Sequence, residues 1–165
     1  TMLEMSAAGA KVLKDDAVEY ARRLGVRIAA GSSSSGKIGT IVSSENLNRD
    51  TLQAMVYNDR LRWIAFEAGT PLPPDCRLCQ FVDGRSIVGV DERQAGVEGV
   101  PCASLSLIGA RVAAQRERVG EVLARLEQVG NRVLAISSTA SKYEIFLEDP
   151  LEPAHVAAIH DMLFV

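Results

Sequence analysis

The sequence has 165 residues, a formal net charge of −3 and a pI near 5.4, and 47% of its residues are hydrophobic. This hydrophobic content supports a packed core and excludes global disorder. The net negative charge argues against the basic surface that a nucleic-acid-binding protein needs. No apolar run approaches the length of a membrane span, and no signal peptide is present. We therefore expect a cytoplasmic chain of one domain or two small modules, without nucleic acid or membrane as partner.

The first elements expected along the chain are helical. Residues 2–24 carry apolar side chains at helical spacing, and Gly25 follows as a helix stop. The chain begins with Thr1 rather than Met, which indicates a cloning remnant or a piece of a longer chain. The apolar face of the helical segment is expected to consist of Leu13, Ala17, Tyr20 and Leu24.

A glycine- and serine-rich loop follows, with the sequence GSSSSGKIG over residues 31–39. It resembles a phosphate-binding P-loop, but Ile38 stands where that loop needs a Ser or Thr to bind Mg²⁺. The next residues, GTIVSS, predict a strand rather than the helix that a P-loop opens. We therefore predict a turn between two strands at 26–30 and 39–44.

The middle of the chain predicts strands and no amphipathic helix. Residues 51–69 indicate two strands joined by a turn at Asn58–Asp59, and residues 79–92 predict a hairpin with Asp83–Gly84 at its turn. Three prolines within residues 70–75 exclude a helix interior or a central strand there.

The three cysteines are Cys76, Cys79 and Cys102. Cys76 and Cys79 form a C-x-x-C pair, but no second pair and no nearby His completes a zinc site. A helix that begins at the pair would lower the pKa of a thiol, but a strand is predicted after this pair instead. A metal or redox role for this pair stays only as a third hypothesis, and we expect no metal and no cofactor.

The last third of the chain predicts the order β-α-β-β-α. Strands are expected at 103–109, 131–138 and 141–149, and helices at 115–130 and 152–164. One further strand would complete a ferredoxin-like βαββαβ sheet with both helices on one face. The early strand at 26–30 is our candidate for this missing strand.

The two histidines, His155 and His160, both fall on the last predicted helix. Their spacing of five places them on different faces, which argues against joint metal binding. His160 shares the apolar stripe of Val156, Ile159 and Leu163, so we expect it to be a core residue with satisfied hydrogen bonds. No Ser-His-Asp order or nucleophile elbow is visible, and we therefore expect no catalytic residue.

Two stretches resemble the regulatory region of aspartate kinases. The first keeps GAKVL (9–13), AVE (17–19) and GTIV (39–42) from the helix, strand and Ser-rich loop that leave the kinase domain in that family. The second begins at LSLIGARV and is similar to the last ACT module in strand order, in the glycine after its first strand and in the IS-S/T end of its second. The resemblance implies an α+β fold of ferredoxin-like ACT modules, the last completed by an early strand, with a degenerate β-rich first module inserted.

The resemblance also implies how the chain is divided. Residues 1–24 would be linker helices from a kinase domain, and 25–50 a strand and loop that join the last ACT module. Residues 51–100 would form a diverged β-rich first ACT module, and 101–165 the second ACT module. We expect the kinase domain in the parent chain, and this piece without it is not expected to phosphorylate anything.

In that family, ACT modules pair sheet to sheet and bind end-product amino acids. The resemblance therefore implies a regulatory fragment that senses lysine or threonine and forms a homodimer through its sheets. The expected effector-binding groups are backbone and hydroxyl groups at Gly109, Ala110, Arg111, Val112, Ser137, Ser138 and Thr139.

The sequence departs from the family pattern in two places. Lys14-Asp15-Asp16 replaces the usual His-Pro-Arg, and Arg116-Glu117 stands where the turn into the first ACT helix commonly carries Pro-Gly. Glu117 would repel an effector carboxylate at that helix start. The alternative hypothesis is therefore a non-catalytic, diverged ACT assembly module that binds no effector.

Overall fold

The computed structural model describes residues 2–8, 13–43, 52–67, 69–73, 76, 78–82, 85–91, 98–109 and 112–164. Among these residues, no helix is long and apolar enough to cross a lipid bilayer. The elements in chain order are α1 (Met2–Ala7), α2 (Asp15–Leu24), β1 (Ile28–Gly31), β2 (Ile38–Val42), β3 (Leu52–Glu67), β4 (Leu78–Val82), β5 (Arg85–Asp91), β6 (Val100–Gly109), the short 3₁₀ helix η1 (Val112–Ala114), α3 (Arg116–Gln128), β7 (Val133–Ser138), β8 (Lys142–Leu147) and α4 (Pro153–Phe164).

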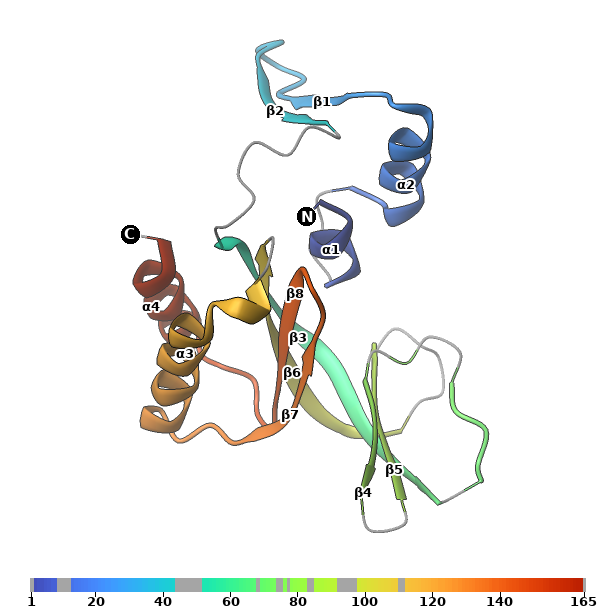
Figure 1. Cartoon of the computed structure of the whole chain (residues 1–165), viewed down its shortest axis with the longest axis vertical. Helices are drawn as coiled ribbons and strands as arrows, with labels where there is room; N and C mark the ends of the chain where they lie inside the picture. The colour runs from blue at the N-terminus through green and yellow to red at the C-terminus, as the bar shows by residue number, and fades with distance from the viewer. Residues whose placement is uncertain are drawn as a thin grey trace.

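The described strands form two separate sheets. The larger sheet has six strands in the order β4-β5-β3-β6-β8-β7, and every neighbouring pair in it is antiparallel. The smaller sheet is the antiparallel pair β1-β2. Helices α3 and α4 lie together on one side of the β6-β8-β7 part of the large sheet, whereas β4 and β5 extend away from them (Figure 1).

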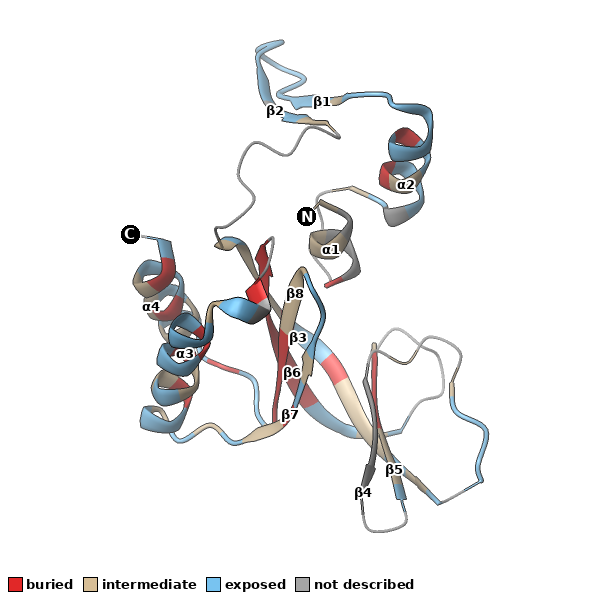
Figure 2. Cartoon of the chain, viewed as in Figure 1, coloured by how far each residue is buried: buried red, intermediate tan, exposed pale blue. Residues whose placement is uncertain are grey.

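The main core lies between the large sheet and the two helices. Side chains alternate between the faces of a strand, so Leu105 and Leu107 of β6 and Ile145 of β8 all point to the helical side. There they meet the apolar stripes of the helices, and Figure 2 shows buried segments on the facing surfaces of these elements. The buried helix residues of this core are Val119, Val122, Leu126, Ile159 and Leu163.

Strand β3 completes the last ACT module. It pairs with the free side of β6, so β3-β6-β8-β7 with α3 and α4 makes the ferredoxin-like arrangement. The prediction that a strand from before residue 101 fills this place is confirmed, but the choice of residues 26–30 is wrong, because β1 pairs with β2. The predicted boundary is also wrong, because β3 lies within 51–100, the residues assigned to a separate first module. The 16-residue β3 pairs with β6 from Leu52 to Trp63 and buries Val56 and Leu61, whereas the four-residue β1 carries two alanines and a glycine.

The predicted turn at Asn58–Asp59 is also wrong, because β3 continues through it. Its register against β6 shifts between Asn58 and Leu61, which marks a β-bulge. The Asn58 Oδ1 atom accepts a hydrogen bond from the Arg60 N–H at 3.0 Å, a local bond that Asn makes in many turns. The turn-forming residues therefore shift the register of the strand without ending it.

The N-terminal segment contacts the helix-free side of the large sheet through α1 and the residue that follows it. Ala8, which follows α1, is fully buried in a cluster with Val56 and Ile108. The predicted apolar face of residues 13–24 is wrong, because Tyr20 and Leu24 are 68% and 59% exposed. The buried residues of α2 are instead Val18 and Ala21, one helical turn apart. Gly25 is confirmed as the helix stop and has a left-handed φ of 66°.

The glycine- and serine-rich loop is a hairpin turn between β1 and β2, as predicted. The Ser32 N–H donates to the Lys37 carbonyl at 3.1 Å, and Gly36 adopts a left-handed φ of 65°. Since a strand and not a helix follows Lys37, the P-loop interpretation is excluded.

The remaining predicted elements are confirmed. The three strands and two helices of the last third are present as β6, α3, β7, β8 and α4. The hairpin predicted at 79–92 is present as the β4-β5 pair, and its turn at 83–84 lies outside the described residues.

We expect Tyr57→Phe to lower the free energy of unfolding by about 1 kcal/mol. The Tyr57 hydroxyl accepts a hydrogen bond from the Leu151 N–H at 2.6 Å, which ties β3 to the loop between β8 and α4. Urea denaturation followed by far-UV circular dichroism measures the change. Tyr20→Phe is the control, because Tyr20 is exposed. Equal stability of the two variants would show that this bond does not anchor β3.

Candidate functional site

The residues predicted to bind an effector lie at one end of the large sheet. Gly109 ends β6 and Ser138 ends β7, with β8 between the two strands. The Gly109 N–H donates to the Ser141 carbonyl, in the turn from β7 to β8, at 3.0 Å. The structure therefore brings the end of β6 and the β7-β8 turn together, and we call this region the effector end of the sheet.

Three of the predicted residues follow Gly109. Val112 is 1% exposed, and its side chain belongs to the main core, which leaves only its backbone for a ligand. Ala110 and Arg111 lie outside the described residues.

The other three predicted residues differ in their hydrogen bonds. The Thr139 hydroxyl accepts bonds from the N–H groups of Lys142 at 3.0 Å and Ser141 at 3.4 Å, so it holds the turn together. Among the described residues, no hydrogen bond involves the side chains of Ser137 and Ser138, and Ser138 is exposed. These two hydroxyls are the side-chain groups of the effector end that a ligand can use.

The start of α3 does not favour a ligand carboxylate. Glu117 lies exposed in the first turn of this helix. A carboxylate at this position interacts favourably with the helix dipole and repels a second anion. An effector at this end of the sheet would therefore bind mainly to groups of the β7-β8 side.

A polar strip that sequence reasoning missed lies on the helix-free face of the sheet. It consists of Ser104 and Ser106 on β6 with Lys142 and Glu144 on β8, and Ser106 is directly opposite Glu144. The two serines and Glu144 are at most 1% exposed. Lys142 Nζ bonds one carboxylate oxygen of Glu144 at 2.5 Å, while the other oxygen and both serine hydroxyls have no partner within the described part of the chain.

The sequence carried a signal for this polar strip. The patterns SLSL over 104–107 and KYEIFL over 142–147 alternate polar and apolar residues, which places the polar ones on the face away from the helices. Such alternation usually predicts a face in water. Here that face is covered, so the polar residues are buried.

The described histidine and cysteine side chains form no cluster. His160 is exposed and its ring lies 5.0 Å from that of Phe164, so the prediction that it is a core residue is wrong. The buried side of α4 is occupied by Ile159 and Leu163. Cys76 has a free thiol, and the side chain of Cys79 lies outside the described residues. No group of three or more His, Cys, Asp or Glu in the described part of the chain could hold a metal ion.

The chain resembles aspartate kinases in sequence. No protein-family model matches it. It is 46% identical to the aspartokinase of Mycolicibacterium smegmatis over 76 residues, which cover 44% of this chain and 18% of that protein.

Two kinds of solved structure share its fold. E. coli aspartokinase III in complex with aspartate and ADP aligns with a TM-score of 0.77 and 17% identity, over 99% of this chain and 45% of that chain. The regulatory subunit of aspartate kinase from Thermus thermophilus aligns with a TM-score of 0.54 and 13% identity, over 70% of this chain and 99% of that chain.

The chain thus spans less than half the length of the aspartokinases that it matches. At these identities the structural likeness establishes the fold, which is the α+β fold of ferredoxin-like ACT modules. The resemblance to the regulatory region of aspartate kinases, predicted from the sequence, is confirmed.

We expect Lys142→Met to lower the free energy of unfolding by about 2–3 kcal/mol at neutral pH, because Glu144 then keeps a buried charge without a partner. The matched control is Arg132→Met, which breaks an ion pair with Glu148 whose side chains are 74% and 37% exposed and should cost less than about 1 kcal/mol. Urea denaturation of both variants tests this contrast.

The double variant Lys142→Met/Glu144→Leu removes the buried charge altogether. It should regain most of the lost stability, because an apolar pair of similar volume often replaces a buried ion pair at little cost. A double variant as unstable as Lys142→Met would show that packing, and not charge, explains the loss.

Proposed function

We propose that this chain is the regulatory part of an aspartate kinase or of a close homologue, which senses an end-product amino acid such as lysine or threonine and pairs as a homodimer. The observation that carries the proposal is the match of aspartokinase III over 99% of this chain, with an ACT-type sheet as the last module. The local identity of 46% with a second aspartokinase supports it independently.

The effector end of the sheet is the proposed amino-acid site. An amino acid carries a carboxylate that needs donors and an ammonium group that needs acceptors, and serine hydroxyls supply both. Ser137 and Ser138 offer such hydroxyls on opposite faces of β7, and the β7-β8 turn next to them offers backbone groups, so a ligand would use one of the two hydroxyls together with the turn. A differential affinity of about 1.4 kcal/mol between two conformations of the parent protein is enough to change its activity tenfold.

The free edge of β7 is the proposed dimer contact. β7 is the last strand of the large sheet, so the outward-facing backbone groups of this edge strand are available for pairing. Ile136 on this strand is 37% exposed, and a partner strand would cover it.

The surface of α2 and the β1-β2 hairpin is the proposed contact with a kinase domain in the parent chain. A two-stranded hairpin is marginally stable without further packing. Several large apolar side chains on this surface are more than half exposed, which supports a covering partner. They are Tyr20, Leu24, Val26, Ile38 and Ile41.

The second candidate function is an assembly module that pairs through its sheet and binds no amino acid. Glu117 in the first turn of α3 and the burial of Val112 favour it, because both reduce what the effector end offers to a carboxylate. The two candidates share the fold and the dimer, and they differ only in effector binding.

Calorimetric titration with lysine, threonine and methionine separates these candidates. For a sensor, we expect saturable heat and a raised melting temperature with one of the three. Ser137→Ala/Ser138→Ala should then weaken binding about tenfold, a loss of about 1.4 kcal/mol. Ser33→Ala, in the exposed hairpin turn, is the control. Absence of heat and of a melting shift at millimolar ligand would reject the sensor and leave the assembly module.

Light scattering at assay concentration tests the dimer. We expect the mass of two chains for the wild type and of one chain for Ile136→Lys, because a charge at the paired β7 edge opposes pairing. Val100→Lys is the matched control, since Val100 is 50% exposed at the far end of β6. A monomeric wild type would contradict the dimer, and an Ile136→Lys dimer would place the contact elsewhere.

A further inference from the structure

A cavity of about 300 Å³ lies at the end of β6 and β7 opposite the effector end. Cys102 near the start of β6 and Ala135 near the start of β7 line it, together with Phe146 of β8. Trp63 of β3 and Ile87 of β5 also belong to its lining. The cavity therefore lies between strands of the last ACT module and β5, which extends beyond that module.

The floor of this cavity is apolar. Cys102 and Phe146 are 1% exposed and Ala135 is 7% exposed, and the three belong to one packed cluster. Burial raises the pKa of the Cys102 thiol to about 11, so the floor carries no charge at neutral pH. Hydrocarbon groups of a ligand would gain by leaving water for this floor.

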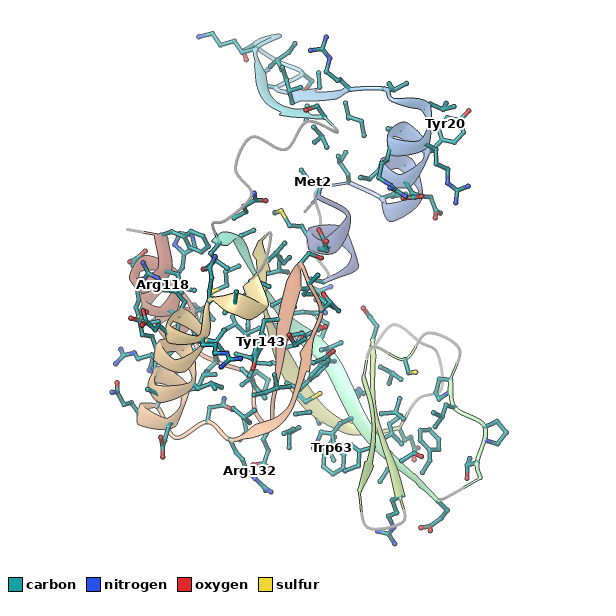
Figure 3. All side chains as sticks on the ribbon, in the orientation of Figure 1. Met2, Tyr20, Trp63, Arg118, Arg132 and Tyr143 are labelled. Atoms are coloured by element: carbon teal, nitrogen blue, oxygen red, sulfur yellow. The ribbon has the colours of Figure 1, made fainter. Side chains whose placement is uncertain are left out.

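The mouth of the cavity carries a cation with spare hydrogen-bond donors. Arg132 Nη1 lies 3.4 Å from Glu148 Oε1, and the Arg132 side chain is 74% exposed. A guanidinium has five N–H donors, and this single loose contact uses one of them. Figure 3 shows Arg132 at the foot of β7, and Trp63 on the side of the sheet away from α3 and α4.

Trp63 also lines the cavity. Its Nε1 atom is buried and has no hydrogen-bond partner among the described residues. The lining thus combines an apolar floor with a guanidinium at the mouth.

We propose that this cavity binds a small apolar carboxylic acid, with its hydrocarbon part on Phe146 and Ala135 and its carboxylate at Arg132. The fork of a guanidinium matches a carboxylate in a bidentate way. The volume falls at the lower end of ligand pockets, which span about 300–1,000 Å³. The charged mouth formed by Arg132 and Glu148 distinguishes the cavity from an apolar patch that docks a protein.

This acid site is separate from the proposed amino-acid site and does not depend on it. Its walls come from β3 and β5 on one side and from β7 and β8 on the other, so a bound acid contacts both parts of the large sheet at once. A ligand that bridges two parts in this way stabilises the arrangement in which both are in contact.

Fluorescence of Trp63 tests the proposal directly, because Trp63 is the single tryptophan of the chain and lines the cavity. The probe is 3-phenylpropionate, and its neutral amide is the matched control ligand. We expect a saturable fluorescence change with the acid, and an affinity for the amide that is about tenfold weaker. Absence of a saturable change at millimolar acid, or equal affinity for the acid and the amide, would overturn the proposal.

Variants of the mouth residues separate charge recognition from apolar binding. Arg132→Gln should weaken binding of the acid about tenfold and leave binding of the amide unchanged. Glu148→Gln should tighten binding of the acid, because Glu148 competes with it for Arg132. Arg116→Gln, an exposed arginine on α3, is the control and should change neither.

Two further outcomes distinguish the acid site from the proposed amino-acid site and from a contact between copies of the chain. Arg132→Gln should leave any lysine or threonine binding unchanged, so a failure of the amino-acid site and a failure of the acid site are told apart. If 3-phenylpropionate gives no saturable signal and Arg132→Gln dissociates a wild-type dimer, the cavity is a contact between copies and the acid site is rejected.

Discussion

The structure depends on the burial of β6 on both of its faces. Eight consecutive residues of this strand, Cys102 to Gly109, are buried, and the strand pairs with β3 on one side and with β8 on the other. One face meets α3 and α4 through Leu105 and Leu107, and the other meets the N-terminal helical segment through Ile108. The last module and the N-terminal segment are therefore held by one central strand, and β3, which pairs with it, carries the strands β5 and β4 beyond the module.

Covering the second face of β6 has an energetic cost, because it takes polar groups out of water. Ser104, Ser106 and Glu144 lie on that face, and Lys142 is the neighbour that compensates the carboxylate. An apolar strip would be at least as stable, since the desolvation of a buried ion pair offsets most of its attraction. Lys142 and Glu144 are both on β8, so their ion pair moves with that strand, but a shift of β8 by one residue against β6 would turn Glu144 to the apolar core, and this cost opposes the shift.

The two proposed sites use opposite ends of the same strands. The amino-acid site lies where β6 and β7 end, and the acid site lies where they begin. The large sheet connects them, and the acid site also includes Ile87 from β5, a strand beyond the last module. In a regulatory protein, a ligand at one site could then stabilise one arrangement of the modules while another ligand binds at the far end of the sheet. The coupling between the two sites would equal the difference in free energy between two arrangements of the sheet.

The sequence by itself determined the local elements and their type. Some features depend only on neighbouring residues and were therefore predictable. They are the helical periodicity in 115–130 and 152–164, the alternation in β8 and the glycines at positions 25 and 36. The resemblance to aspartate kinase regulatory regions was predictable as well.

The tertiary structure alone decided which strand pairs with β6, and that Asn58 shifts the register of a strand instead of ending it. It also decided that Tyr20 and His160 face solvent, and that Trp63 lines one cavity with Phe146 and Arg132. These outcomes depend on contacts between residues far apart in the chain, where pairing length and buried area decide between alternatives that look alike locally. Residues 26–30 and 52–67 both have a strand pattern, and only the longer one buries enough side chains along β6 to hold that place.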